Sequence, residues 1–315
     1  MMSNKYMLIN KNIICIGAIF DFSLYCKLMP NSELQCIIEK DSLLINDDVK
    51  KSKNTEAIYV NESEYKNYKR YYENYLANIS KDKNITFEDR SKAMYVNASK
   101  LLVDIFKNPE VTGNYEKSKE LVGDLVTTVS DDEFSIKSLA SIAIDDDSYT
   151  HTHTHSINVS IYALSLASFL NFSKDSLSDI GESALLHDLG KSKIDSKIVN
   201  KKGKLTDQEF KIIQNHSNLG YYLGMKIGIK KRSVLNGIKY HHEKMDGSGY
   251  PLKLKGEDIP LFARIIGVCE TFDALTTHRS YKAAISPFEA LKLMKIEMKN
   301  HLDMNLVNKM IMMFR

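Results

Sequence analysis

The histidines of this chain are gathered in one stretch, and they limit how that stretch can fold. Eight of the nine histidines lie between residues 151 and 278. Two of them, His241 and His242, are adjacent in the segment YHHEKMDGSGYP, although neighbouring side chains on a regular element point in different directions. Such a pair is awkward in an ordinary core.

The residues after the pair can end a helix. Gly247 and Gly249 permit a positive φ angle, and Pro251 stiffens the exit from the turn. Both histidines can reach one centre only where the helix stops, so the segment favours a helix that closes at the pair. These residues alone leave a plain surface turn as the alternative.

Helical periodicity surrounds the histidines, and from residue 145 onward the sequence predicts only helices and loops. One helical stripe runs through His155, Val159, Ala163, Leu166 and Leu170. A second helix is predicted over residues 177–188 and is expected to stop near Gly190.

Capping residues mark the remaining helices. Thr206 and Glu209 form a capping box that opens a third helix, on which His216 is expected to lie. Further helices are predicted over residues 234–242 and 260–275 and after Ser286-Pro287.

The chain before this bundle shows two other sequence patterns, one β-prone and one helical. Up to residue 61, β-prone stretches (IICIGAIF, LQCIIE and AIYV) are broken by polar residues, which predicts a small α/β regulatory domain. Residues 62–144 are expected to form a helical connector that ends in an acidic run. The predicted domains are therefore residues 1–61, 62–144 and 145–315, in a chain that is mostly α-helical.

Composition argues against some partners. The net charge of +3 is too small to indicate a nucleic-acid or membrane surface. The longest early apolar run, residues 13–20, is far too short to span a bilayer, and Asp21 follows at once. The four cysteines form no CxxC pair, which is typical of reduced thiols. A cytoplasmic protein with no nucleic-acid and no membrane partner is expected.

Side chains that suit a metal ion occur at helical sites throughout the bundle. The candidate ligands are His155, His187, Asp188, His216, His241, His242 and Glu270. Imidazole nitrogen and carboxylate oxygen suit divalent iron, manganese and zinc. A single histidine on a helical stripe is more often a core residue. Each candidate lies on a separate helix or at a helix end, so one bundle core can gather them all.

Four segments carry a resemblance to a known family: ALLHDLGKSKI, NHSNLGYYLG, YHHEKMDGSGYP and ARIIGVCETFDALTTHRSYK. In this order they resemble the HD-GYP domain, a branch of the HD superfamily of metal-dependent phosphohydrolases, over roughly residues 145–315. The resemblance implies an all-helical HD-type bundle and a cyclic di-GMP phosphodiesterase that forms pGpG and then GMP. It also implies that the GYP loop, which contains Gly249-Tyr250-Pro251, borders the substrate cleft and binds diguanylate cyclase (GGDEF) proteins. A homodimer is a further expectation.

The resemblance assigns the ligands to two ions. It implies that His155, His187, Asp188 and Glu270 bind one ion and that Asp188 bridges to a second ion, which is held by His216, His241 and His242. The expected metal is iron or manganese. Two ions that share a carboxylate and a hydroxide are an established arrangement for phosphoester hydrolysis.

The resemblance also implies residues that hold the substrate. Lys191 lies three residues after Asp188 and is expected to face the same site, so these two residues are the predicted catalytic pair. Lys191, Tyr250, Arg279 and Lys282 are the predicted substrate-binding residues. The fork of an arginine suits phosphate because it contacts two oxygens at once.

The sequence departs from the family pattern at two ligand positions. The family has Asp where this chain has Glu270, and the extra methylene puts the first metal site in question. His151 stands where some members have a Glu that supports a third metal and many have a Tyr. An imidazole can replace that Glu as a ligand, so the sequence is compatible with either two or three bound ions. His151 is one helical turn before His155 and can share its face.

Two other functions fit these observations. One is a non-catalytic signalling module that binds a cyclic dinucleotide or a partner protein through the GYP loop. The other is hydrolysis of a different phosphoester, such as another cyclic dinucleotide.

Overall fold

The protein was analysed in a computed structural model, which describes part of the chain. The described residues are 5–9, 14, 18–27, 33–45, 47, 50, 52, 55, 57–79, 87–130, 151–201, 203–277 and 284–314; within them, the side chains of 73, 76–79, 87–93, 96 and 151–152 are not described. The chain forms two compact units, Met1–Ala93 and Met94–Arg315, and each is considered by itself. The predicted domain boundaries after residues 61 and 144 stay predictions.

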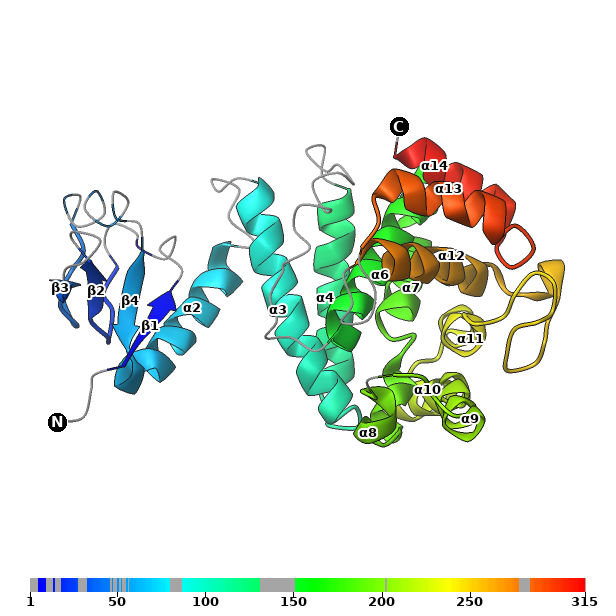
Figure 1. The fold of residues 1–315 in the computed structure, drawn as a ribbon, viewed down its shortest axis with the longest axis horizontal. Helices are drawn as coiled ribbons and strands as arrows, with labels where there is room; N and C mark the ends of the chain where they lie inside the picture. The colour runs from blue at the N-terminus through cyan, green and yellow to red at the C-terminus, as the bar shows by residue number, and fades with distance from the viewer. Residues whose placement is uncertain are drawn as a thin grey trace. The chain divides into compact units, whose positions relative to one another are not determined.

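The first unit is built on a four-stranded antiparallel sheet. Its strands are β1 (Tyr6–Ile9), β2 (Leu24–Lys27), β3 (Leu34–Ile38) and β4 (Ile58–Asn61), in the order β1-β4-β2-β3. A short 3-10 turn, η2 (Glu62–Glu64), leads from β4 into α2 (Tyr65–Ile79), which lies beside the sheet (Figure 1). The β-prone stretches LQCIIE and AIYV thus become β3 and β4, whereas half of IICIGAIF (residues 13 and 15–17) falls outside the described residues.

The core of the first unit is aromatic. Phe20 and Phe22 are fully buried and stacked on each other. The ring of Tyr71 from α2 meets Phe20 edge-on, and the ring of Tyr68 meets Phe22 in the same way. Edge-to-face packing of this kind stabilises a core beyond the burial of apolar area.

Helices make up the described part of the second unit, which confirms the predicted fold class. The α-helices are α3 (Phe87–Lys107, which begins in the first unit), α4 (Asn114–Val129), α6 (His151–Phe169), α7 (Lys174–Leu185), α8 (Ser196–Val199), α9 (Asp207–Gln214), α10 (His216–Ile227), α11 (Arg232–Tyr240), α12 (Leu261–Thr276), α13 (Pro287–Glu297) and α14 (Met304–Met313). Two 3-10 helices, η3 (Leu189–Lys193) and η4 (Gly256–Asp258), lie between them.

Helix α6 is the central element of this bundle, with α4, α7, α12 and α14 packed around it (Figure 1). Its predicted stripe is confirmed at His155, Val159, Ala163 and Leu166, which are all buried, whereas Leu170 follows the last residue of α6 and is only partly buried. A helix that is covered on most sides is apolar nearly all round, so polar residues on α6 are exceptions that need partners.

Helix ends depart from the prediction at two places that matter for the site. Helix α7 ends at Leu185 instead of continuing to Asp188, and a β-carbon on Gly190 would lie 1.9 Å from the His216 carbonyl oxygen. The chain must therefore leave α7 early so that η3 can lie directly against α10. His216 does not lie on the helix that Thr206 opens. The N–H of Asn215 bonds the Ile212 carbonyl, which tightens the last turn of α9, and α10 begins anew at His216.

Other helix signals are confirmed. The capping box of Thr206 and Glu209 opens α9, and a second capping box of Ser286 and Glu289 opens α13. Among the described residues, no helix combines the length and apolar character needed to cross a membrane.

Candidate metal centre

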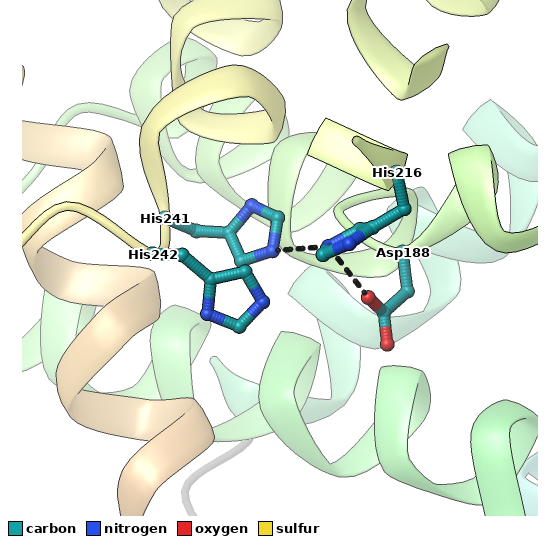
Figure 2. Close-up of side chains that lie close together, drawn as sticks. All are labelled: Asp188, His216, His241 and His242. Atoms are coloured by element: carbon teal, nitrogen blue, oxygen red, sulfur yellow. Dashed lines mark hydrogen bonds and ion pairs between the residues drawn. The ribbon is translucent and has the colours of Figure 1, made fainter. Parts of the chain in front are cut away.

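The predicted ligands converge because helices begin or end beside them. Asp188 caps η3 directly after His187, His216 is the first residue of α10, and His241 and His242 follow the last residue of α11. Figure 2 shows how these termini direct Asp188, His216, His241 and His242 toward one point. His155 reaches the same region from α6, since its ring lies 5.3 Å from the ring of His187.

Two groups of possible ligand atoms share one carboxylate. In the first group, Asp188, His216, His241 and His242 each offer a donor atom, and these atoms all lie within 4.8 Å of one another. In the second group, His155, His187 and Asp188 meet the same criterion. The shared residue is Asp188, which is the residue predicted to bridge two ions.

Backbone carbonyls fix the tautomer of three of these imidazoles. The Nδ1 atoms of His187, His216 and His241 lie 2.7, 2.6 and 2.7 Å from the carbonyl oxygens of Ala184, Ile213 and Ile238. A carbonyl oxygen can only accept, so each Nδ1 carries the hydrogen and donates it. Each Nε2 is then left with a lone pair directed into the cluster, as a metal ligand requires.

The distance between two of these nitrogens fits one ion. His216 Nε2 lies 3.2 Å from His241 Nε2, although both atoms carry lone pairs. Two nitrogens that are each about 2.1 Å from one ion stand about 3.0–3.4 Å apart at ligand angles near 90–110°. Within the described residues, buried His187 Nε2 and Asp188 Oδ1 have no hydrogen-bond partner. These donor atoms fit a divalent cation, which would turn the mutual repulsion of the lone pairs into coordination.

Burial and charge set the protonation states that such a site needs. Burial lowers the pKa of His216 to about 4, and it also lowers the pKa values of His241 and His242. Burial works against the ionised form of Asp188, yet Lys191 and His187 hold its pKa well below the usual range. At neutral pH His216, His241 and His242 are therefore neutral imidazoles and Asp188 is an ionised carboxylate, whereas burial of His187 is outweighed by Asp188, which leaves the pKa of His187 raised.

Comparisons with known proteins agree with this geometry. The sequence pattern of the HD domain family matches residues 137–306, which is more than half of the chain. The chain belongs to the HD domain family. This confirms the resemblance that the four motif segments predicted.

Relatives of the HD domain include proteins with named activities. The chain is 36% identical over 140 residues to a cyclic di-GMP phosphodiesterase of Pseudomonas aeruginosa, covering 44% of this chain and 34% of that protein. It is 40% identical over 134 residues to a probable cyclic di-GMP phosphodiesterase of Vibrio cholerae (39% and 29% of the two chains). It is 39% identical over 127 residues to a 3'3'-cGAMP-specific phosphodiesterase of the same organism (39% and 24%).

These matches span only about a third or less of each relative's length. Among solved structures, the fold is similar to that of an HDG"Y"P protein from Bdellovibrio bacteriovorus, with a TM-score of 0.63 and 19% identity. That similarity covers 97% of this chain and 98% of the other, and it bears on the fold alone.

Glu270, the second acidic ligand predicted in the HD domain, lies at the edge of the cluster. Its Oε2 atom is 3.6 Å from His242 Nδ1, and it belongs to neither of the two ligand groups. Burial raises the pKa of Glu270, but His242, His187 and His155 outweigh this and leave it lowered. Its role as a ligand of the first ion stays a prediction.

His155 differs from His187, His216 and His241 because a side chain, not a backbone carbonyl, holds its Nδ1 atom. Asp273 Oδ2 lies 2.6 Å from this nitrogen, and the Asp273 side chain is fully buried. The sequence reasoning did not assign a role to Asp273. The available signal was its position three residues after Glu270 on one predicted helix, which places both carboxylates near one face.

The predicted catalytic lysine contacts the shared carboxylate. Lys191 Nζ lies 2.6 Å from Asp188 Oδ2, while Asp188 Oδ1 faces His216 Nε2 at 3.4 Å. The lysine thus neutralises one oxygen of Asp188 and is placed within reach of any anion bound at the cluster.

The GYP loop is fastened to the histidine pair by Glu243, another residue that the sequence reasoning did not assign. Its carboxylate accepts hydrogen bonds from the backbone N–H groups of Leu252 and Leu254, at 2.6 and 3.0 Å. A β-carbon on Gly249 would lie 2.5 Å from the backbone of residues 242–244, so the loop lies directly on this segment. Tyr250 is thereby held with its ring 4.7 Å from that of His242.

A cavity of about 350 Å³ opens beside the cluster. It is bordered by His242 and Glu270 on the cluster side and by Thr271, Met298 and His301 further out. Its size is in the range of small-molecule sites.

Three predictions cannot be compared with the structure. Arg279 and Lys282 lie outside the described residues. Helix α6 begins at His151, but the side chain of His151 is not described.

Proposed function

We propose that the chain is a metal-dependent phosphodiesterase that hydrolyses cyclic di-GMP to pGpG, with GMP as a further product. The observation that supports it most is the facing pair of His216 Nε2 and His241 Nε2 beside the shared carboxylate of Asp188. The names of the relatives support the substrate class. We further propose that two ions of iron or manganese bind, with His151 as the ligand position for a third.

The residues of the cluster have separate roles in the proposed phosphoester hydrolysis. Divalent ions at this site would supply Lewis acidity and lower the pKa of water. In their neutral form, His187, His216 and His241 present the Nε2 lone pair to the cluster, because their Nδ1 protons are bonded to carbonyl oxygens. Asp188 stays ionised and serves both ligand groups.

We assign phosphate binding to basic side chains around the cluster. Lys191 is already anchored at Asp188 and can hold a phosphate oxygen next to the ions. Arg279 and Lys282 are proposed to contact the phosphate that the ions do not neutralise. Tyr250 is proposed to border the substrate beside His242, which its ring contacts. The exposed part of the GYP loop is the proposed surface for GGDEF proteins.

The proposal is tested by product analysis on protein prepared anaerobically and loaded with Mn²⁺ or Fe²⁺. Cyclic di-GMP should be converted to pGpG, as followed by chromatography. His155→Gln should lose metal and turnover. His153→Gln is the matched control, because His153 lies on the same helix with its ring against Phe106, outside the cluster. Fully metal-loaded protein that leaves cyclic di-GMP and other phosphoesters intact would favour the non-catalytic signalling module.

A second substrate is supported by one comparison. A relative of nearly equal identity is named a 3'3'-cGAMP-specific phosphodiesterase. The same assay with 3'3'-cGAMP decides between the two, and faster turnover of the hybrid dinucleotide would replace cyclic di-GMP as the proposed substrate.

A further inference from the structure

A chain of hydrogen bonds links the ligand histidine of α6 to a helix outside the matched HD domain. It starts at Asp273 on α12, whose side chain is fully buried. Asp273 Oδ2 faces His155 Nδ1 at 2.6 Å, and Oδ1 accepts from Asn158 Nδ2 at 2.8 Å and from Thr277 Oγ1 at 2.9 Å. Both carboxylate oxygens are therefore engaged.

The chain continues to Tyr95 on α3. The Tyr95 hydroxyl donates to Asn158 Oδ1 at 2.9 Å, and the tyrosine is only 5% exposed. Asn158 thus presents its oxygen to a donor and its NH₂ group to a carboxylate. If the amide were turned over, its oxygen would face the Asp273 carboxylate, which can only accept, so Asp273 determines which way Asn158 points. Tyr95 donates to the amide oxygen that is left and holds Asn158 in place against Asp273.

The consequence for His155 follows from its tautomer. A carboxylate at Nδ1 keeps the proton there and leaves the Nε2 lone pair for a metal ion, and it makes that nitrogen a stronger donor. In His187, His216 and His241 the partner of Nδ1 is instead a backbone carbonyl of the preceding turn. Backbone carbonyls move only with their helix, whereas Asp273 and Asn158 are side chains whose position depends on further partners.

We infer that Tyr95 is a positioning residue for the metal ligand His155, acting through Asn158 and Asp273. The inference rests on the metal centre proposed above. Tyr95 lies before residue 137, where the match to the HD domain family begins. The affinity for the ion held by His155, His187 and Asp188 is therefore set partly by helix α3. Asn158 and Asp273 transmit this effect without contacting the ion.

Tyr95→Phe tests this inference because it removes one oxygen and keeps the ring. The matched control is Tyr162→Phe, since Tyr162 is partly buried and lies near Asp273 but its hydroxyl bonds to Thr276. Mn²⁺ affinity is measured by calorimetric titration of the metal-free protein, together with the thermal midpoint of each variant. Loss of a direct outer partner of a ligand typically weakens metal binding about 10- to 100-fold.

We expect Asp273→Asn to weaken one of the Mn²⁺ binding steps within that range. Tyr95→Phe should weaken the same step by about 3- to 10-fold, because it acts one residue further away. The other step should be unchanged in both variants. Tyr162→Phe should bind Mn²⁺ like the parent, even if its thermal midpoint falls as much as that of Tyr95→Phe.

A second readout needs no metal. In the metal-free parent, the imidazole ¹⁵N shifts of His155 should report a proton on Nδ1, and Tyr95→Phe should move them toward a mixture of tautomers. If Tyr95→Phe binds Mn²⁺ like the parent and leaves these shifts unchanged, the inference is wrong while the metal centre stands. If the parent itself binds no Mn²⁺, the metal centre is wrong and the inference falls with it.

Discussion

The two units bury different kinds of side chain. The first unit packs aromatic rings around Phe20 and Phe22, and the buried polar residue described there is Ser52. The second unit buries many ionisable groups, and six of them are gathered at or beside the metal centre: His155, His187, Asp188, His216, His241 and Asp273. Burying such groups costs free energy unless they are paired. The first core is therefore complete as an apolar core, whereas the second is built for a charged ligand.

The largest expected effect comes from removing the residue that serves both ligand groups. Asp188→Asn should lower metal content below one ion per chain and turnover by on the order of a thousandfold, because a neutral amide is a poor ligand between two cations. Elemental analysis and product chromatography check both. Asp179→Asn is the control, since Asp179 is an aspartate of α7 whose partner is Lys231. Full metal content in Asp188→Asn would refute the shared-carboxylate arrangement.

A substitution in the aromatic core of the first unit should lower stability and leave metal content unchanged. Phe22→Ala should destabilise that unit by about 3–5 kcal/mol through the cavity that it leaves. Metal content should stay at the parental value. Leu8→Ala is the control in the same unit, because Leu8 is 64% exposed. Denaturant unfolding with elemental analysis makes the measurement, and metal loss in Phe22→Ala would show that the comparison between the two cores is wrong.

Metal removal should lower the stability of the second unit and leave that of the first unit unchanged. Ions present at a hundred times their Kd stabilise the folded state by about 2.7 kcal/mol, and chelation removes this contribution. Hydrogen exchange followed by mass spectrometry should show lost protection in α10 and α11, with β2 and β4 unchanged. Equal losses in the strands and in these helices would contradict the prediction.

The smallest expected effect is a dependence of stability on pH in the metal-free protein. Burial lowers the pKa of His216 from its usual value near 6.5 to about 4, so the unfolded chain binds more protons between these values. Stability therefore falls as the pH drops through this window, by on the order of 2 kcal/mol at pH 5 for His216. His241 and His242 act in the same direction. The pKa of His187 is raised, because its contacts with Asp188 outweigh burial, so His187 offsets part of the loss.

The first unit provides the internal control for this pH effect, because every histidine of the chain lies after residue 150. Exchange protection in β2 and β4 should stay constant between pH 7 and 5 while protection in α10 falls. A uniform change across both units would assign the effect to groups other than the histidine cluster.

The sequence was informative wherever a role depends on local pattern. The motif segments located the histidines that converge, and capping boxes located the starts of α9 and α13. The ends of α7 and α9 were predicted less well, because the close approach of Gly190 to α10 is a tertiary contact that periodicity does not contain. Strands β1 and β2 were missed for a similar reason, since their pairing with β4 joins residues far apart in the chain.

Residues that act through other residues were the hardest to predict. Asp273 and Glu243 gain their roles from partners that only the fold brings close, namely His155 for the first and the backbone of the GYP loop for the second. A single carboxylate on a helix face has many possible uses. Tyr95 lies even further from the motif segments, and no sequence pattern links it to His155.

The central claim is that His216 and His241 share an ion with Asp188, and anomalous diffraction from crystals of the Mn²⁺-loaded protein tests it most directly. The account predicts two manganese peaks about 3.5–4 Å apart with the Asp188 carboxylate between them, one of them in contact with the Nε2 atoms of both His216 and His241. The account is contradicted if manganese is bound elsewhere and these two nitrogens still face each other 3.2 Å apart with no ion between them.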